Sequence, residues 1–228
     1  IENAHFKFKQ RANKVDGLRN VSFLVPHVDE YIWQGYLIWL ETVCKELEIN
    51  QKRRDDIREL EVKNFQLTVV KEKDYFYVEL PSDYYRHLES YVECKTPKCG
   101  KKKIRTSIIQ KDDIFSSDLM FASSYQFERV NIDLSRNRIY IYVSDFDVEE
   151  FYMTYIRRPI KPANPKHHPG GTYKYADGTP AIQQDVEVDS TFQIEKILDI
   201  AVLVAMRDTG NLTDFQSQLN KILNISKI

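Results

Sequence analysis

Two cysteines separated by a short turn come nearest to a metal-binding pattern in this sequence. Cys94 and Cys99 flank the segment KTPK. Structural zinc needs four ligands, commonly two close pairs of Cys or His. The other nearby candidate is His87, and the adjacent pair His167 and His168 lies far along the chain. The pattern therefore favours two cysteines at strand ends, and we expect no metal and no cofactor.

Catalysis would require a nucleophile, a base and a group that orients the base. The sequence has no G-x-S-x-G elbow, no phosphate-cradling glycine loop and no H-E-x-x-H pair. Adjacent carboxylates such as Asp55 and Asp56 point in different directions on a helix or a strand, so they form no ready dyad. His5, His27 and His87 each lack a recognisable motif partner. We therefore expect that the protein is not an enzyme.

A basic cluster is the candidate for contact with phosphate groups or with DNA in a channel. Lys101, Lys102, Lys103 and Arg105 lie together in KCGKKKIR, at an expected hairpin tip. Such a tip can neutralise phosphate charge without reading base sequence, although basic residues also simply solubilise exposed turns. The whole chain has 33 basic and 34 acidic residues and a net charge of -1. That balance argues against a dedicated nucleic-acid binder.

The charged segment QKRRDDIREL carries candidate residues for a subunit interface. In it, Arg53 and Arg54 directly precede Asp55 and Asp56. Neighbours of opposite sign are typical of a solvated face, or of one that forms salt bridges between subunits.

A tyrosine-rich stretch, RIYIYVSDFDVEEFYMTYIRRP at residues 138–159, supplies further interface candidates. Both faces of its two expected strands carry large side chains, which predicts cover on both sides, by the chain itself or by a neighbour. Aromatic residues and arginine are enriched where proteins meet proteins, which favours Tyr152, Tyr155, Arg157 and Arg158 as contacts. The acidic turn between the strands argues against a stacking platform for single-stranded nucleic acid.

These residues are positioned by helices, then strands, then helices. Apolar residues at helical spacing from Val28 to Leu47 predict a first long helix, and Ile194–Ala205 repeats the pattern. Between residues 65 and 158 the period is two, which predicts a meander of antiparallel strands. Residues 159–180 hold five of the eight prolines and three of the seven glycines, so regular structure should stop there. A last helix is expected at residues 212–223, after Gly210.

We therefore expect an α+β fold with a helical base, an inserted antiparallel β-sheet domain and an extended arm rich in Pro and Gly. The expected parts are an N-terminal arm and helices (1–62), the β domain (63–158), the extended arm (159–189), and C-terminal helices (190–228) that pack on the N-terminal helix. An arm of this kind can reach a neighbouring subunit. In that case deletion of residues 163–180 would weaken assembly and leave the fold intact.

The composition also bears on the compartment. No apolar run approaches the length of a membrane span, and the first residues show no secretory signal. Three cysteines are few and odd in number, which disfavours a disulfide framework. We expect synthesis in a reducing cytoplasm and no membrane partner.

The order of the segments resembles structural proteins of the crAss-like phages and related tailed bacteriophages of Bacteroidetes. The matching pieces are YIWQGYLIWL with INQKRRDDIREL, then YFYVELPSDYYRHLESYVEC, then FYMTYIRRPIKP, and finally ILDIAVLVAM. They span residues 25–225 and are structural signatures that contain no catalytic residue.

The resemblance implies a virion structural protein, a head-to-tail connector or neck-ring subunit. Such a subunit would assemble as a homo-oligomeric ring, typically twelvefold, between portal and tail around the DNA channel. Its partners would be the phage portal protein and other neck and tail proteins, with transient non-specific contact with genomic DNA. It would be made in the host cytoplasm and reside at the head–tail junction of the virion.

Two alternatives remain from the residues. The first is a tail or baseplate-type adhesion module, in which the tyrosine-bearing sheet binds a host surface glycan or receptor. The second is a DNA-binding accessory protein that uses the basic tip.

Overall fold

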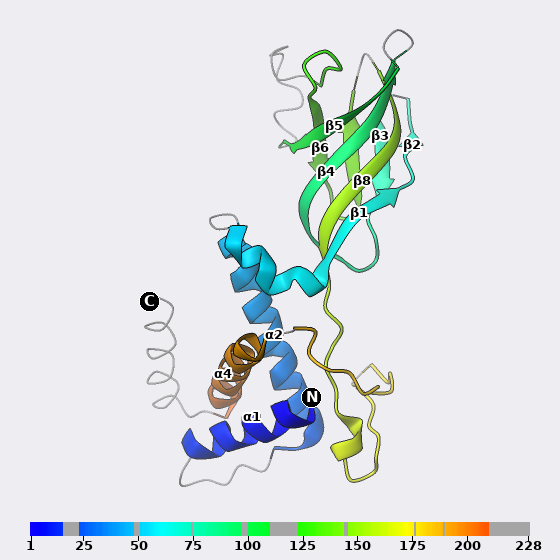
Figure 1. Ribbon diagram of the computed structural model, residues 1–228. Helices are drawn as coiled ribbons and strands as arrows, with labels where there is room; N and C mark the ends of the chain where they lie inside the picture. Colours follow the sequence, from blue (N-terminus) through cyan, green and yellow to red (C-terminus); the bar gives the residue numbers. More distant parts are fainter. Residues whose placement is uncertain are drawn as a thin grey trace. The chain divides into compact units, whose positions relative to one another are not determined.

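The computed structural model describes residues 1–15, 23–47, 51–73, 75–96, 100–109, 123–143, 146–175, 177–188 and 190–209. These residues include both helices and strands, which confirms the expected mixture of α and β structure (Figure 1). The chain divides into two compact units. Unit 1 combines Ile1–Glu59 with Pro159–Ile228, and unit 2 is Leu60–Arg158. Three features singled out from the sequence lie outside the described residues. They are the expected last helix at residues 212–223, its cap at Gly210, and Cys99.

The described part of unit 1 contains several helices. They are α1 (Glu2–Val15), α2 (Val25–Leu47), α4 (Thr191–Asp208) and two 3-10 helices, η1 (Gln51–Leu60) and η3 (Pro165–His167). The apolar face expected from Val28 onward is the buried face of α2, since Val28, Ile32 and Tyr36 have no exposed surface. Phe8 of α1 and Leu198 of α4 pack in the same cluster as Ile32. None of the helices in the described part of the chain combines the length and hydropathy that a bilayer span requires.

The helices α2 and α4 pack closely at a glycine. A Cβ atom placed on Gly35 would lie 2.7 Å from the carbonyl oxygen of Ile197 and 2.8 Å from the amide nitrogen of Ala201. Both of these atoms belong to the backbone of α4, so they cannot turn aside as a side chain would. Position 35 therefore has to lack a side chain for the two helices to pack in this way.

The strands described in unit 2 form one eight-stranded sheet with the strand order β1-β8-β4-β5-β6-β7-β3-β2. The strands are β1 (Glu61–Leu67), β2 (Val70–Lys71), β3 (Phe76–Glu79), β4 (Tyr84–Thr96), β5 (Gly100–Ile108), β6 (Val130–Leu134), β7 (Arg138–Tyr142) and β8 (Asp147–Arg157). The strands by which the chain enters and leaves the unit are neighbours, because Glu61 pairs with Ile156.

The sheet differs from the expected antiparallel meander in two respects. β5 and β6 pair in parallel. β8, the last strand in the sequence, lies between β1 and β4 and not beside β7. A parallel pair needs a connection of about a dozen residues or more, and the stretch from Ile109 to Arg129 is long enough to supply it. All the other strand pairs are antiparallel.

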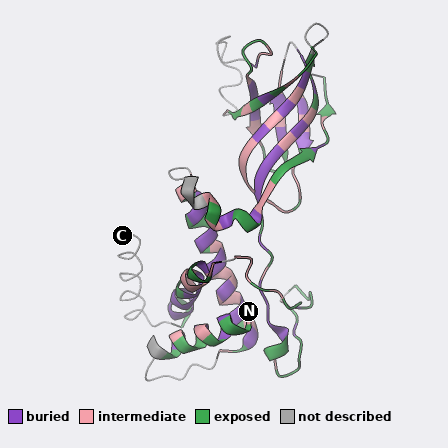
Figure 2. Ribbon diagram, viewed as in Figure 1, coloured by how far each residue is buried: buried purple, intermediate pink, exposed green. Residues whose placement is uncertain are grey.

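One face of the sheet forms the core of unit 2. Its cluster includes Val92 of β4, Ile104 of β5 and Phe151 of β8, and Figure 2 shows buried positions along β4 and β8. In β7, Ile139 and Ile141 are buried while the tyrosines between and after them are half-buried, as the alternation predicts. Strand alternation thus decides which side chains face outward and are available for contacts.

The segment 159–188, which the structure describes except at residue 176, folds back on unit 1 of its own chain. A backbone bridge joins Ala163 to Gln184, and Ala163 and Tyr173 pack with Val25 of α2. Apart from η3 it contains no helix, in keeping with its proline content. Its expected reach to a neighbouring subunit stays a prediction.

Candidate interaction surface

The candidate surface is the outer side of β8, β4 and β5, which we call the outer tyrosine face. Val92, Ile104 and Phe151 point into the core, so the residues on either side of each of them point outward. The face comprises Glu89, Tyr91, Glu93 and Lys95 of β4, Lys101, Lys103 and Arg105 of β5, and Glu149, Glu150 and Tyr152 of β8. It therefore contains four of the residues singled out from the sequence: Lys101, Lys103, Arg105 and Tyr152.

An aromatic pair lies at the centre of this face. Tyr91 and Tyr152 are paired across β4 and β8, and their rings stack at 4.9 Å between centroids with an angle of 15° between planes. The ammonium group of Lys103 lies 5.1 Å from each ring centroid, within cation–π range. The three side chains hold one another in place, which reduces the conformational entropy that a partner would have to remove.

The charges around the aromatic pair are matched. Lys101 lies 2.5 Å from Glu149 and 3.4 Å from Glu93, and Lys95 also reaches Glu149, at 3.5 Å. Hydrogen bonding to Glu149 raises the pKa of Lys101, and the same bond lowers the pKa of Glu149. Exposed ion pairs of this kind add little stability. Their main effect is that the face carries no surplus of positive charge.

The remaining members of the expected basic tip are also paired. Lys102 forms an ion pair with Glu128 and lies 5.8 Å from the ring centroid of Tyr125. Arg105 lies 4.0 Å from Glu89 and is 80% exposed. The structure thus places all four basic residues of the tip opposite carboxylates or aromatic rings. Their contact with phosphate stays a prediction, and it would require these pairs to open.

The two tyrosines predicted as interface residues occupy different environments. The hydroxyl of Tyr152 donates to Glu150, and this bond raises the pKa of Tyr152 to about 12. Tyr155 is 2% exposed and belongs to the core, where its hydroxyl donates to Asp83 at 3.0 Å. Burial, followed by that hydrogen bond, raises the pKa of Tyr155 to about 12. Only Tyr152 of the two is therefore available to a partner.

The other predicted interface residues are distributed between the units. In unit 1, Asp56 accepts a hydrogen bond from Gln193 of α4 at 2.9 Å, so it binds its own chain. Asp55 is exposed and Arg54 half-buried, and the side chain of Arg53 lies outside what the structure describes. In unit 2, Arg157 is half-buried and Arg158 is exposed. These residues are therefore divided between the two units.

A buried polar centre in unit 1 has no signal in the sequence. The Nε2 atom of His5 donates to Oδ1 of Asp29 at 2.5 Å. The other oxygen, Oδ2, accepts from the backbone N–H of Asn164 at 3.0 Å and from the hydroxyl of Tyr173. The side chains of His5 and Asp29 are 3% and 0% exposed. A His–Asp pair often serves in acid–base catalysis, but this one is shielded from any substrate and joins α1, α2 and the 159–188 segment.

A second histidine contact, in unit 2, is also structural. The Nε2 atom of His87 lies 2.8 Å from the hydroxyl of Ser90, which lies 2.5 Å from the hydroxyl of Thr106. Ser90 is only 2% exposed, so it cannot act as a nucleophile on a substrate from solution. Burial lowers the pKa of His87 and favours its neutral form. The interaction joins β4 to β5.

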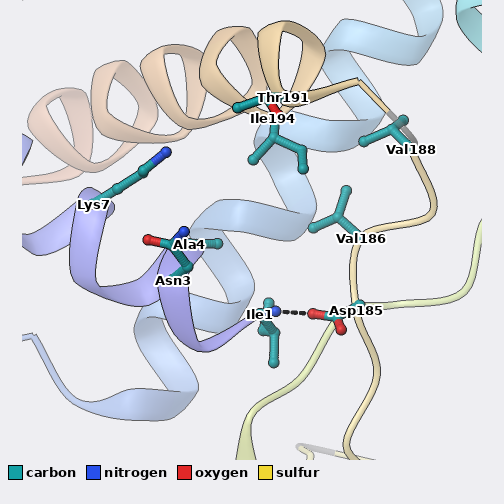
Figure 3. A pocket seen from close by; sticks show the side chains of 9 residues that line it. All are labelled: Ile1, Asn3, Ala4, Lys7, Asp185, Val186, Val188, Thr191 and Ile194. Atoms are coloured by element: carbon teal, nitrogen blue, oxygen red, sulfur yellow. Dashed lines mark ion pairs between the residues drawn. The ribbon is translucent and has the colours of Figure 1, made fainter.

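A cavity of about 340 Å³ opens in unit 1 between α1, α4 and the 159–188 segment (Figure 3). Its lining residues are Ile1, Asn3, Ala4, Lys7, Asp185, Val186, Val188, Thr191 and Ile194. The amine of Ile1 pairs with Asp185, and Lys7 lies 2.5 Å from Glu195 of α4. Because these charged groups are already paired, the cavity presents no unpaired charge to orient a reacting ligand.

Metal ligands do not gather in the described part of the chain, where no three His, Cys, Asp or Glu residues lie close enough to hold an ion. Cys94 is buried. Comparison with protein-family models gave no matching family, and a search of the curated proteins gave no matching relative.

Proposed function

We propose that this protein is a bacteriophage head-to-tail connector, a neck-ring subunit that contacts other virion proteins and performs no catalysis. In this proposal the helical unit is the base, the β unit is an insertion, and the 159–189 arm helps to join neighbouring subunits. The segment resemblance described above supplies the biological setting. The twelvefold ring, the portal partner and the location in the virion all belong to this proposal.

The single observation that carries the proposal is the outer tyrosine face. A stacked tyrosine pair surrounded by matched charges suits a protein partner, because aromatic side chains dominate binding energy at the centre of such interfaces. A DNA-binding face would instead need unpaired basic groups. On this face Lys95 and Lys101 are paired with carboxylates at 2.5–3.5 Å, and Lys103 lies over the two tyrosine rings.

Light scattering combined with negative-stain imaging of the purified protein tests the proposal. We expect closed rings, or a monomer that docks onto isolated portal rings. A trimer that binds glycans would exclude the connector and favour the adhesion module.

A pair of variants tests the role of the face. Tyr91→Ser/Tyr152→Ser should weaken ring formation or docking by about tenfold or more, as expected for loss of a central aromatic contact. The matched control is Tyr140→Ser/Tyr142→Ser, which removes two half-buried tyrosines of β7 outside the face. Equal loss in the two variants would show that the face has no special part in assembly.

A further inference from the structure

A cleft in unit 2, separate from the outer tyrosine face, brings together three arginines. It has a volume of about 480 Å³ and lies among the β3–β4 connection, the β6–β7 turn and the end of β8. Its lining residues are Glu79, Leu80, Pro81, Ser82, Tyr84, Arg136, Asn137, Arg138 and Arg158. We call it the arginine cleft.

Backbone hydrogen bonds hold the three segments of the cleft together. The N–H of Leu80 donates to the carbonyl of Asn137 at 3.0 Å, and the N–H of Arg158 donates to the carbonyl of Asp83 at 2.5 Å. The β6–β7 turn is closed by the N–H of Ser135, which donates to the carbonyl of Arg138 at 2.9 Å. The arginines therefore project from a fixed frame, which is the condition for a preorganised site.

Arg138 is the anchored member of the three. Its guanidinium lies 3.1 Å from the carboxylate of Glu79 and 4.5 Å from the ring centroid of Tyr77. A carboxylate on one side and an aromatic face on the other fix the plane of the guanidinium. A side-chain hydrogen bond with Tyr140 engages the guanidinium further, and the N–H groups beyond these contacts lie on the same plane.

Arg136 and Arg158 supply positive charge that no carboxylate in the described part of the chain neutralises. Among the described residues, neither guanidinium has a hydrogen bond, an ion pair or a ring contact. Three arginines thus face one carboxylate, Glu79, in a single cleft. On the outer tyrosine face, by contrast, Lys95 and Lys101 are paired with glutamates of the same face.

We propose that the arginine cleft binds a phosphoryl group. A phosphate monoester carries a charge of about -1.5 to -2 at neutral pH and offers three acceptor oxygens. That charge matches the surplus of two guanidinium groups, whereas a single carboxylate would leave one of them unneutralised. Guanidinium forks also fit phosphate oxygens in a bidentate arrangement. The hydroxyl of Ser82 and the side-chain amide of Asn137 add neutral donors to the lining.

The phosphoryl group can belong to a small phosphorylated molecule or to a nucleic-acid backbone, since both offer the same oxygens. If the source is a nucleic acid, the contact would occur at the cleft and not at the basic tip, whose side chains already contact carboxylates or aromatic rings. The inference stands on the cleft alone and does not depend on the connector proposal.

Calorimetric titration of the full chain with pyrophosphate at low ionic strength tests the inference. We expect saturable binding to the wild-type protein. Arg136→Gln/Arg158→Gln should weaken it by about tenfold or more, because each arginine supplies charge-assisted hydrogen bonds. The matched control, Lys95→Gln/Arg105→Gln, removes the same charge from the outer tyrosine face and should change the affinity less than twofold.

Three results would overturn the inference: no binding of pyrophosphate at millimolar concentration, equal loss of affinity in the control, or equally tight binding of acetate. Circular dichroism of both variants shows whether each is folded, and Arg136→Lys/Arg158→Lys retains the charge if the glutamine variant does not fold. A parallel titration with a short single-stranded oligothymidylate identifies the source. Tighter binding than pyrophosphate, lost in Arg136→Gln/Arg158→Gln, indicates a nucleic-acid backbone; weaker binding indicates a small phosphorylated molecule.

Discussion

Asp29 accepts three hydrogen bonds at a position with no exposed surface. A buried carboxylate is tolerated only when it is paired and hydrogen-bonded. His5, the backbone of Asn164 and Tyr173 provide those bonds from three different parts of the sequence. Burial, followed by the bond to Asp29, raises the pKa of Tyr173, so its phenol remains a donor across the whole neutral range. Asp29 therefore links α1, α2 and the 159–188 segment.

Removal of this carboxylate should strongly destabilise unit 1. Asp29→Ala leaves three buried donors without an acceptor, and we expect a loss of about 3–5 kcal/mol in the free energy of unfolding. Tyr173→Phe removes one donor and should cost about 1–2 kcal/mol. Urea unfolding followed by circular dichroism measures both changes. Asp55→Ala, at an exposed position, is the control and should change stability by less than about 0.5 kcal/mol; an equally small effect of Asp29→Ala would contradict a structural role.

His87 should make the stability of unit 2 sensitive to acid. Burial lowers its pKa, so the folded protein binds the proton less readily than the unfolded chain does. The contribution of neutral His87 to the free energy of unfolding is complete above the pKa of the unfolded state, about 6.5. It is lost as the pH falls toward the lower pKa of the folded state. Replacement by Gln keeps a hydrogen-bonding group but cannot titrate. We expect His87→Gln to lose stability less steeply than wild type as the solution is acidified.

A direct titration of the imidazole checks the same prediction. Nuclear magnetic resonance of the His87 ring proton should give a midpoint below that of a free histidine. A midpoint equal to the free value would mean that burial does not lower the pKa of His87, and wild type and His87→Gln should then lose stability equally steeply on acidification.

Helix packing gives the first prediction at the scale of elements. Gly35→Ala adds a Cβ atom 2.7 Å from a backbone oxygen of α4. The overpacking should cost about 1–3 kcal/mol, which outweighs the gain of about 1 kcal/mol in helix propensity. Thermal unfolding measures the change. Asn13→Ala, on an exposed position of α1, is the control and should leave the midpoint unchanged or raise it.

The 159–188 segment gives the second prediction at this scale. Sequence alone predicts that deletion of residues 163–180 leaves the fold intact, but the packing predicts otherwise. The deletion removes Asn164 and Tyr173, which bond to Asp29, and Ala163, which packs on Val25. We expect a lower free energy of unfolding for unit 1. Removal of the exposed tip alone, residues 169–172, keeps these contacts and should leave stability near that of wild type. Equal stability of the two deletions would show that the docked contacts contribute nothing.

Local periodicity predicts elements but not their partners. The apolar spacing of α2 and the alternation of Ile139 and Ile141 are visible in the sequence because they repeat within a few residues. The parallel pairing of β5 with β6, and the contact of His5 with Asp29, join positions that only the folded chain brings together. The same limit applies to the interface candidates. Strand alternation groups Tyr155 with the core residues Phe151 and Met153. The enrichment of aromatic residues at interfaces, by contrast, does not distinguish Tyr155 from Tyr152.

At the scale of the whole molecule, each unit has its own hydrophobic core. One core cluster contains residues of α1, α2 and α4, and the other contains residues of the strands. We therefore expect Leu60–Arg158, expressed alone, to fold. Circular dichroism should show β structure, and nuclear magnetic resonance should show dispersed amide signals. The same fragment with Val92→Asp, a charge in the core, is the unfolded reference. Collapsed amide signals for the unmodified fragment would contradict independent folding.

Insertion of unit 2 between the two parts of unit 1 also dictates an order of events during translation. Every strand from β1 to β8 is synthesised before α4, the helix that packs against Phe8 and Ile32. Unit 2, although it comes second along the chain, is complete first on the ribosome, and domains generally fold as units as they emerge. The apolar surfaces of α1 and α2 that α4 covers in the folded protein remain exposed throughout that interval. The nascent chain is therefore most exposed to premature association, or to capture by chaperones, while its β unit is being made.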